Sequence, residues 1–312
     1  MAEIKKILIA NRGEIVQRAI RTIKEMGKKS VAVYSAGDKN ASYLKHADEA
    51  VCIGGAKSSE SYLNIPALIT AAEMTGCDAI FPGYGFLSEN QDFVEICKLH
   101  NIKFIGPSSE VMEKMADKSK AKEEMVRAGV PVVPGSKGAV RTLDEGKKIA
   151  REIGYPIMAK ASAGGGGRGM RLIKEEKDFD SQYLAASSEA LAAFGDGTMY
   201  LERFINNPRH IEVQVIGDSH GNAIHIGERD CSLQRRHQKV IEESPAILLN
   251  DETRAKLHEV AVKATKYLKY EGAGTFEFLA DDKQNIYFME MNTRLQVEHP
   301  VSEMVSGLDI IE

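Results

Sequence analysis

Two glutamates late in the chain, Glu277 and Glu290, have the spacing expected of a divalent-cation site. Two strands, at 275–279 and 286–292, with a polar turn between them, are predicted from the alternation in GTFEFLADDKQNIYFMEMN. In this hairpin Glu277 lies opposite Glu290, and Asn292 lies on the same face. Carboxylates directly across a ladder repel each other, and Mg²⁺ removes the conflict because it binds one or two carboxylates together with substrate phosphates. A solvated acidic face or a neighbouring lysine is the alternative.

A glycine-rich segment could bind the phosphates that accompany such a cation. The run AKASAGGGGRGM at 159–170 offers backbone N–H groups that can approach an anion closely. Its glycines fit the pattern GxGxxG, but no helix N-cap follows them and no Gly-Lys-Ser/Thr is present, so neither a dinucleotide site nor a Walker A loop is indicated. Lys160, in an apolar stretch, and Lys118 each offer a positive charge, although a single lysine is more often a solvated surface residue.

Two further polar segments suggest a pocket for a small anion. The first, SLQRRHQK at 232–239, holds two arginines, a histidine and Lys239, without the aromatic residues typical of nucleic-acid binding. In the second, MNTRLQVEHP, alternate positions carry Arg294, Gln296 and Glu298, which an extended segment would project to one side. An arginine and a carboxylate beside a metal could orient a substrate and act as a base. A surface salt bridge is the alternative.

The length, net charge and cysteine content of the chain indicate which classes of protein and partner to expect. The 312 residues are enough for two or three domains, and the net charge of −4 gives no general attraction to nucleic acid or to an anionic membrane. The four cysteines show no metal-binding spacing, which indicates free thiols in a reducing compartment. No signal peptide and no membrane span is recognisable. We therefore expect a cytoplasmic protein with neither nucleic acid nor membrane among its partners.

Alternating strands and helices are predicted for the first third of the chain. Short apolar runs alternate with helical stretches, which predicts a parallel sheet with right-handed crossovers and a Rossmann-like build. The expected strands lie at 6–10, 30–35, 50–54, 78–83 and 103–107, and the expected helices at 13–27, 64–75 and 89–100. The first turn, NRGE, lacks the three glycines of a dinucleotide site, so the fold does not imply NAD.

Two smaller units are predicted for the remainder of the chain. A helix at 118–128 and a connector rich in Pro and Gly precede the unit that holds the glycine-rich segment. Strands at 209–218 and 222–232 follow. A later helix at 251–270 has Asp251 as its expected N-cap. The side chains expected on its buried face are Leu257, Val260, Ala264, Tyr267 and Leu268.

Several of these segments together resemble biotin carboxylase, an ATP-grasp enzyme. The matching stretches, which run in family order over essentially the whole chain, are ILIANRGEI, PGYGFLSEN, KASAGGGGRGM, NPRHIEVQV, ERDCSLQRRHQK, GAGTFEF and EMNTRLQVEHPVSEM. The resemblance implies an α/β fold in which a Rossmann-like N-terminal domain precedes an ATP-grasp fold of two α+β lobes. The implied domains are the N-terminal domain at 1–115, a helical connector at 116–131, a small lobe at 132–204 and a large lobe at 205–312.

The resemblance also implies a role for each site residue. Arg294, Glu298 and Lys239 would be catalytic, and Tyr84 would bind biotin. The residues implied to bind ATP are Lys118, Lys160, Gly166, Gly167, Glu202, Arg203, Phe204, Ile205, His210, Gln234, His237, Glu277 and Glu290. Those implied to bind bicarbonate are Lys239, Arg294, Gln296, Val297 and Glu298. The magnesium (or manganese) ligands would be Glu277, Glu290 and Asn292.

The implied reaction is the ATP-dependent carboxylation of carrier-bound biotin by bicarbonate through carboxyphosphate, as in acetyl-CoA carboxylase. Pyruvate or propionyl-CoA carboxylase, another ATP-grasp ligase, or a nucleotide-binding module without full activity are the alternatives. Expected partners are a biotinylated carrier protein, carboxyltransferase subunits and, at full length, a second copy of the chain. Because family members continue beyond the final SGLDIIE, we expect a piece that lacks the C-terminal part of the large lobe.

Overall fold

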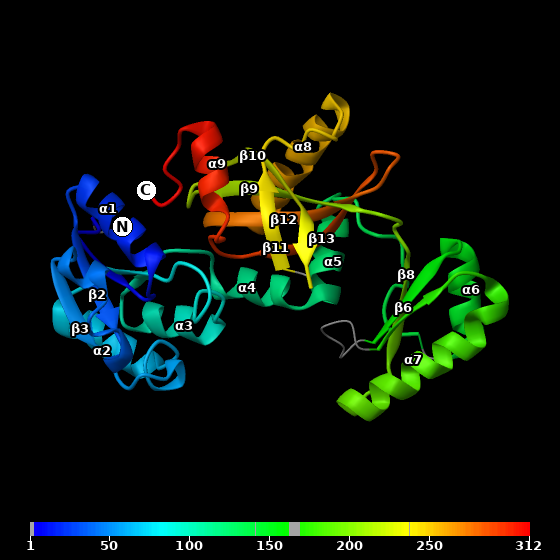
Figure 1. Ribbon diagram of the computed structural model, residues 1–312, viewed down its shortest axis with the longest axis horizontal. Coiled ribbons are helices and arrows are strands. Elements are labelled where there is room, and N and C mark those ends of the chain that lie inside the picture. Colours follow the sequence, from blue (N-terminus) through cyan, green and yellow to red (C-terminus); the bar gives the residue numbers. More distant parts are fainter. Residues whose placement is uncertain (1–2, 141, 162–168, 237) are drawn as a thin grey trace. The chain divides into compact units, whose positions relative to one another are not determined.

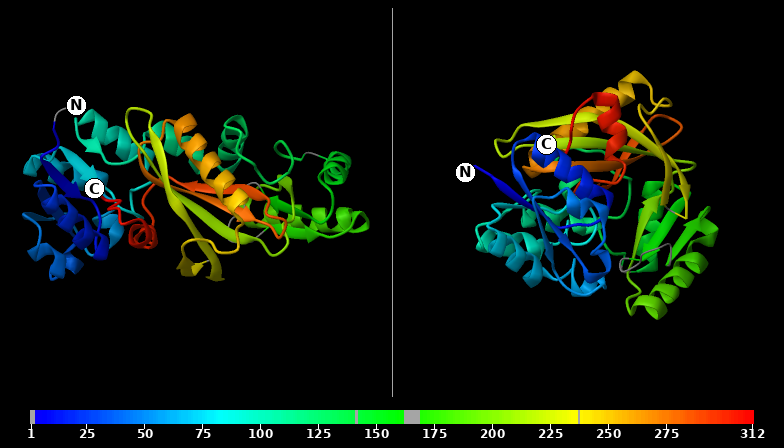
Figure 2. Two further views of the ribbon diagram at one scale, coloured as in Figure 1. Left: turned by 90° about the horizontal axis from the view of Figure 1, so that it is seen from above. Right: turned by 60° about the vertical axis from the view of Figure 1, so that its left-hand side comes forward.

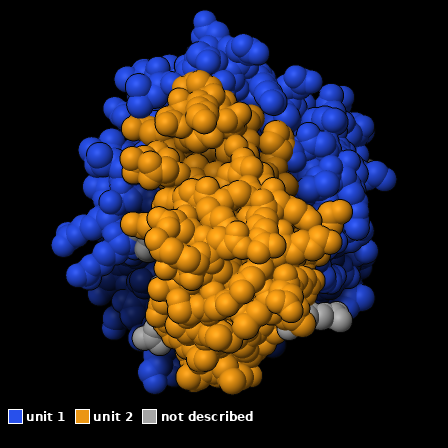
Figure 3. Space-filling view, turned by 90° about the vertical axis from the view of Figure 1, so that its right-hand side faces the viewer, with its two compact units in different colours: residues 1–130, 210–278, 290–312 blue, residues 131–209, 279–289 orange. Residues whose placement is uncertain are grey.

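The computed structural model describes residues 3–140, 142–161, 169–236 and 238–312. The chain forms two compact units (Figure 3). Unit 1 comprises residues 1–130, 210–278 and 290–312, and unit 2 comprises residues 131–209 and 279–289. Unit 2 is therefore an insertion in the chain of unit 1. The division into four parts that the resemblance implies stays a prediction.

A five-stranded parallel sheet begins unit 1, with the strand order β3-β2-β1-β4-β5 (Figure 1). Its strands are β1 (Lys6–Ile9), β2 (Lys29–Tyr34), β3 (Glu49–Cys52), β4 (Ala79–Phe81) and β5 (Lys103–Phe104). The crossover helices are α1 (Glu14–Glu25), α2 (Ile65–Thr75) and α3 (Gln91–Leu99). This arrangement confirms the α/β fold and its Rossmann-like first part.

Local sequence signals explain how these helices begin and end. Asn64 and Asn90 cap α2 and α3, each accepting a hydrogen bond from a backbone N–H three residues on. Gly76 ends α2 in the left-handed conformation, with φ of 66°. The buried side chains of α1 recur every three to four residues, so one face of this helix packs on the sheet.

Two short helices follow the parallel sheet where the sequence predicted one. They are α4 (Ser109–Ala116), capped by Ser108, and α5 (Lys118–Arg127). Helix α5 matches the expected helix at 118–128, whereas α4 was not anticipated. Short 3₁₀ turns complete the helical segments at Ala36–Asp38, Ser42–Lys45, Ser58–Glu60 and Glu176–Asp178.

A second sheet has the strand order β11-β10-β9-β12-β13. Its strands are β9 (Arg209–Gly217), β10 (Ala223–Arg235), β11 (Gln238–Glu243), β12 (Gly272–Ala280) and β13 (Ile286–Asn292). The last two strands confirm the predicted hairpin, and β12 extends beyond the expected 275–279 at both ends. Helices α8 (Asp251–Leu268) and α9 (His299–Ser306) both pack against β10 (Figure 2).

Helix α8 corrects two details of the prediction. Asn250, not Asp251, is the N-cap, since its Oδ1 accepts from the backbone N–H of Thr253 at 2.8 Å. Tyr267 is 42% exposed, and its hydroxyl donates to Glu124, so it does not belong to the buried face. The other four side chains expected on that face are buried.

Unit 2 is built on a three-stranded antiparallel sheet with the order β7-β6-β8. Its strands are β6 (Ile157–Ala161), β7 (Met170–Ile173) and β8 (Met199–Arg203), and its helices are α6 (Leu143–Ile153) and α7 (Phe179–Phe194). Apolar side chains from these elements form one core around Phe179 and Leu201. Strands β6 and β7 flank the glycine-rich segment, whose residues 162–168 lie outside the described part of the chain.

Two expectations from composition can be compared with the structure. All four cysteines are free. Among the described helices, none has the length and the apolar character that crossing a membrane requires.

Candidate functional site

Lys239, on β11, is the centre of a charged cluster in unit 1. Its ammonium nitrogen donates to Glu212 on β9 at 2.5 Å, to Glu277 on β12 at 2.9 Å and to Glu298 at 2.6 Å. An ammonium has three N–H donors, so these three carboxylates satisfy all of them. Burial disfavours the charged form, but Glu212 and Glu277 outweigh it and raise the pKa of Lys239.

Glu277 is the most heavily partnered carboxylate of this cluster. Besides Lys239, its Oε1 accepts from Asn292 at 2.8 Å and from Gln296 at 3.0 Å, and its Oε2 lies 2.9 Å from Nε2 of His210. Burial opposes ionisation, but His210 and Lys239 more than offset it and lower the pKa of Glu277 to about 2. Glu277 is therefore an anion near neutral pH.

Arg229, on β10, is a fully buried cation within the same group of residues. Its guanidinium donates five hydrogen bonds to side chains on β9, on β12, on α9 and in the segment that follows β13. The acceptors are Glu212 (2.6 Å), Gln214 (3.0 Å), Thr275 (3.5 Å), Gln296 (2.9 Å) and Ser302 (2.7 Å). Because a buried arginine cannot lose its charge, these partners stabilise it in place.

The segment after β13 places Arg294 beside the cluster. Arg294 donates through Nη2 to Oδ1 of Asn292 at 3.0 Å and through Nε to Glu89 at 2.9 Å. The other oxygen of Glu89 accepts from the backbone N–H of Thr293 at 3.0 Å. Val297, in contrast, is 62% exposed.

The second predicted metal ligand, Glu290, has a different environment. Its carboxylate lies 3.4 Å from the ammonium of Lys118, and both side chains are partly exposed. Lys118 and Glu290 were both assigned to the nucleotide phosphates and their metal, and the structure pairs them. The opposition of Glu277 and Glu290 across the hairpin stays a prediction.

Two groups of side chains beside Lys239 bring possible metal ligands close together. Ligand atoms of His210, Glu212 and Glu277 lie within 4.8 Å of one another, as do those of Glu212, Cys231 and Glu298. Carboxylate oxygens are the atoms that Mg²⁺ prefers. Asn292 is oriented with its nitrogen toward Glu277 and its oxygen toward Arg294. Of the three predicted metal ligands, Glu277 belongs to the first of these groups, whereas Glu290 and Asn292 belong to neither, and the assignment of the three stays a prediction.

In unit 2, the structure pairs two further residues of the predicted nucleotide site. Lys160 on β6 donates to Glu202 on β8 at 2.5 Å. The backbone N–H groups of Arg203 and Phe204 donate to carbonyl groups of Pro134 and Pro156, so these two donors are engaged within unit 2. Ile205 is buried. The segment LERFI at 201–205 is therefore bonded through its backbone to two other parts of unit 2.

The other predicted residues have individual surroundings. Gln234 on β10 is paired in register with Lys239 on the neighbouring strand β11. Its side-chain amide donates to the carbonyl of Cys231 at 3.0 Å. The hydroxyl of Tyr84 donates to Glu14 at the start of α1. Three predicted residues lie outside the described part of the chain, namely Gly166, Gly167 and His237.

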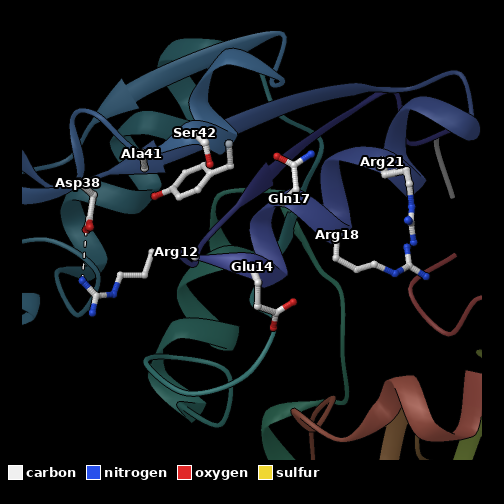
Figure 4. Close-up of a pocket in the computed structure, with 10 residues that line it drawn as sticks. Arg12, Glu14, Gln17, Arg18, Arg21, Asp38, Ala41 and Ser42 are labelled. Atoms are coloured by element: carbon white, nitrogen blue, oxygen red, sulfur yellow. Dashed lines mark hydrogen bonds and ion pairs between the residues drawn. The ribbon is translucent and has the colours of Figure 1, made fainter.

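A pocket in unit 1 lies away from these assignments. It has a volume of about 800 Å³ and is lined by residues of α1 and of the 36–45 region. The ion pair of Arg12 with Asp38, at 3.4 Å, lies at one end, and Arg18 and Arg21 lie at the other (Figure 4). None of the lining residues had been assigned to a substrate, so pocket size alone does not identify the site.

Sequence reasoning missed Arg229, Glu212 and Glu89. Strands β9 and β10 were read as alternating, which assigns their charged residues to a solvent face. In the structure both faces of the middle of β9 are buried, from Ile211 to Val215. The sequence signal that could have revealed Glu212 is a charged residue within an apolar run, because a buried charge requires a partner.

Two sequence models of known families match the chain. Residues 3–112 match the model described as biotin carboxylase, N-terminal domain. Residues 117–312 match the model described as carbamoyl-phosphate synthase L chain, ATP binding domain. Together these matches cover nearly all of the sequence, including every residue of the cluster around Lys239.

Relatives of named function are similar over almost the whole chain. A biotin carboxylase of Nostoc sp. is 57% identical over 98% of this chain, which spans 68% of that protein. A chloroplastic biotin carboxylase of Populus trichocarpa is 56% identical over 99% of this chain, which spans 58% of it. The mitochondrial methylcrotonoyl-CoA carboxylase subunit alpha of Mus musculus is 54% identical over 99% of the chain, which spans 43% of it.

Solved structures agree with these relatives. A crystal structure of biotin carboxylase from Campylobacter jejuni is 70% identical, with a TM-score of 0.88, and the match covers 99% of this chain and 69% of that one. The biotin carboxylase domain of a thermophilic 2-oxoglutarate carboxylase is 50% identical, with a TM-score of 0.94, over 99% and 68% of the two chains. The sequence, the fold and the site residues thus lead to one assignment. The chain belongs to the biotin carboxylase family of ATP-dependent ligases.

Proposed function

We propose that the protein uses ATP to activate bicarbonate as carboxyphosphate and then carboxylates biotin on a carrier protein. The observation that carries this proposal is the arrangement of Lys239 among Glu212, Glu277 and Glu298, with Gln296 hydrogen-bonded to Glu277. Such a group combines a base, a cation and amide donors within one small region. These are the groups that a small oxyanion requires for binding and deprotonation.

Glu298 is the proposed base. Its carboxylate would take the remaining proton of bicarbonate, so that one oxygen of the resulting carbonate can attack the γ-phosphorus of ATP and ADP leaves. Lys239 contacts Glu298 at 2.6 Å and offsets the charge that grows on the substrate. Arg294 and the Gln296 amide would orient the anion. In phosphoryl transfer the protein contributes chiefly by such positioning and charge neutralisation.

The resemblance to biotin carboxylase supports a set of ATP-binding residues, and each unit contributes its own members of that set. The described residues proposed to bind ATP include two ion pairs, Lys118 with Glu290 and Lys160 with Glu202. The others are Arg203, Phe204, Ile205, His210, Gln234 and Glu277. Magnesium, or manganese in its place, would be bound by Glu277, Glu290 and Asn292 and would neutralise the phosphate oxygens. A relative supports the ligand set, since the biotin carboxylase domain of the Hydrogenobacter thermophilus 2-oxoglutarate carboxylase is solved with MgADP and bicarbonate.

The final acceptor of the carboxyl group is proposed to be acetyl-CoA, in fatty acid synthesis. Several relatives are named simply biotin carboxylase, whereas others belong to methylcrotonoyl-CoA and 2-oxoglutarate carboxylases. Propionyl-CoA and pyruvate are the competing acceptors, and a biotin carboxylase subunit of pyruvate carboxylase is a structural neighbour. We further propose a cytoplasmic location, carboxyltransferase partners and a homodimer at full length, as for the relative described as a dimer.

The test is bicarbonate-dependent cleavage of ATP by the purified protein, with and without free biotin. We expect cleavage that requires bicarbonate, increases with biotin and transfers ¹⁸O from labelled bicarbonate into phosphate. Glu298→Gln should abolish this reaction, and Glu259→Gln, on the surface of α8, should not change it. Cleavage that is indifferent to bicarbonate would contradict the proposal.

A second candidate is a nucleotide-binding module without full activity. The observation in its favour is that residues 117–312 match a model described as an ATP binding domain, a description that names nucleotide binding and not biotin carboxylation. Tight binding of MgADP by calorimetry without any ATP cleavage would support this second function over the first.

A further inference from the structure

The guanidinium of Arg229 uses its full hydrogen-bonding capacity inside unit 1. A guanidinium carries five N–H donors in a fixed planar fork. The Nε atom makes one bond and each Nη atom makes two, which accounts for all five. The side chain has no exposed surface. This cation therefore has a single orientation, and its partners are oriented by it.

The five bonds fall into two groups. Three of them join the guanidinium to the scaffold, at Gln214 on β9, Thr275 on β12 and Ser302 on α9. The other two reach the cluster around Lys239, at Glu212 and Gln296. The fork thus connects packed secondary structure to the residues assigned to the substrate.

The bond to Gln296 determines which way its amide faces. Oε1 of Gln296 accepts from Arg229 at 2.9 Å, so Nε2 must point the other way, where it donates to Glu277 at 3.0 Å. An amide rotated by half a turn would place its NH₂ group against the guanidinium, where two donors would face each other. One N–H of Gln296 remains for a further acceptor in this orientation.

The bond from Arg229 to Glu212 helps to position Lys239, because Glu212 bridges the two cations. Oε1 of Glu212 accepts from Arg229 at 2.6 Å and Oε2 accepts from Lys239 at 2.5 Å. Glu212 has no exposed surface, so its position depends on these two cations. Without Arg229, Lys239 would be the one cation bonded to Glu212, and Glu212 would compete more strongly with the substrate for that ammonium.

We propose that Arg229 is a positioning residue for the anion substrate, because its guanidinium fixes the Gln296 amide directly and the Lys239 ammonium through Glu212. This inference rests on the proposed function, since it takes bicarbonate as that anion. Lysine cannot replace Arg229 in this role. An ammonium is a point charge with three donors and cannot span Glu212 and Gln296 while it also binds the scaffold.

The decisive comparison is Arg229→Lys against Ser302→Ala. Arg229→Lys keeps the charge and removes the fork, whereas Ser302→Ala removes one scaffold bond and leaves Glu212 and Gln296 connected. We expect Arg229→Lys to raise the KM for bicarbonate by about tenfold or more, as for a lost charged hydrogen bond, with the KM for MgATP changed by less than about threefold. Ser302→Ala should lower the thermal midpoint and leave both KM values unchanged.

The inference is overturned if folded Arg229→Lys keeps the wild-type KM for bicarbonate, or if both variants raise it equally. Should Arg229→Lys fail to fold, Glu212→Gln tests the same connection. It keeps the shape and removes the charge that joins the two cations, so it should raise the KM for bicarbonate selectively. An unchanged value in folded Glu212→Gln would equally overturn the inference.

A second measurement does not depend on turnover. The side-chain NH₂ signals of Gln296, assigned by NMR with Gln296→Met, should be protected from hydrogen exchange in the wild type and in Ser302→Ala. They should lose this protection in Arg229→Lys. Equal protection in all three proteins would contradict the role of Arg229. A wild-type protein that cleaves no ATP but shows the expected exchange pattern would instead contradict only the proposed function.

Discussion

Glu89 and Arg294, 205 residues apart in the sequence, form an ion pair with Nε and Oε2 at 2.9 Å. The remaining oxygen of Glu89 accepts from both the backbone N–H and the hydroxyl of Thr293. The loop between β4 and α3 thereby holds the start of the segment that carries Arg294, Gln296 and Glu298. A loop of the parallel sheet and the antiparallel sheet are thus connected at the proposed substrate.

Glu89→Gln should weaken the use of bicarbonate. The amide keeps an acceptor for Thr293 but loses the charge that orients Arg294, so we expect the KM for bicarbonate to rise about threefold to tenfold, the effect of a partly exposed ion pair. Steady-state ATP cleavage at varied bicarbonate measures it. Glu95→Gln, on α3, is the matched control and should behave as wild type. Equal values for the two variants would show that Glu89 does not act on Arg294.

Glu290→Gln should weaken the metal-dependent step. Loss of one charged ligand is expected to lower Mg²⁺-dependent ATP hydrolysis by about tenfold or more at fixed metal concentration, with partial recovery at high Mg²⁺. Calorimetric titration with MgADP and a Mg²⁺ series in the hydrolysis assay provide the measurements. Glu243→Gln, at the end of β11, serves as the control. Unchanged turnover in Glu290→Gln would remove this residue from the metal site.

Lys160→Gln should reduce the affinity for MgADP. Lys160 now pairs with Glu202, and the charge that it offers to a phosphate is lost in the variant, so we expect a Kd about tenfold higher. Lys174→Gln, an exposed lysine just after β7, should leave the Kd unchanged. If both substitutions alter the affinity by the same factor, the charge of unit 2 as a whole matters rather than Lys160.

The lowered pKa of Glu228 predicts how the free energy of unfolding depends on pH. This glutamate is buried on β10 and bound by His258 at 2.7 Å and Arg254 at 2.9 Å. Burial raises its pKa, but His258 and Arg254 outweigh this and lower it to about 2. Since the folded-state pKa lies below the ordinary value of 4.5, this group stabilises the fold above pH 4.5, and its contribution disappears as the pH falls toward 2.

Glu228→Gln should therefore cost about 1 to 3 kcal/mol at pH 7 and roughly half as much or less at pH 3. Urea unfolding at pH 7, 4.5 and 3 measures this loss. Glu259→Gln, at an exposed position of α8, should cost little at any pH. A loss of the same size at all three values of pH would show that packing, and not the charge, makes Glu228 important.

Gly217, at the end of β9, occupies a position that no larger residue can share. A Cβ there would lie 2.0 Å from the carbonyl oxygen of Tyr270, which is backbone and cannot move aside easily. Gly217→Ala should cost about 3 kcal/mol of unfolding free energy. Gly221→Asn, in the following turn, has open space around it and a left-handed φ of 86° that asparagine tolerates, so it should cost far less. Thermal unfolding of the two variants compares them.

The elements of this fold were largely readable from sequence, because each is a local pattern. The hairpin around Glu277 follows from alternation and a polar turn, and α1 follows from its apolar stripe. The N-cap of α8 was displaced by one residue, since asparagine and aspartate at 250 and 251 are equally good caps. Helix α4 was missed because its eight residues give too short a periodicity.

The contacts of the site were harder to read, because they depend on strand order. Lys239 was assigned to the substrate, but its three carboxylate partners lie on β9, on β12 and before α9, which only the order β11-β10-β9-β12-β13 brings together. Arg229 was overlooked for a related reason. Whether a charged residue in a strand faces solvent or a buried partner depends on what covers the sheet, and no local pattern carries that information.

The insertion of unit 2 into unit 1 has a consequence for folding during synthesis. All five strands of the parallel sheet have been made once Phe104 has left the ribosome, so this sheet can form before the later strands are synthesised. The antiparallel sheet must wait for β12 and β13, by which time all of residues 131–209 have been made. A nascent chain halted before β12 would therefore expose β9 as an unpaired strand edge, and translation speed between these points sets how long that edge stays open.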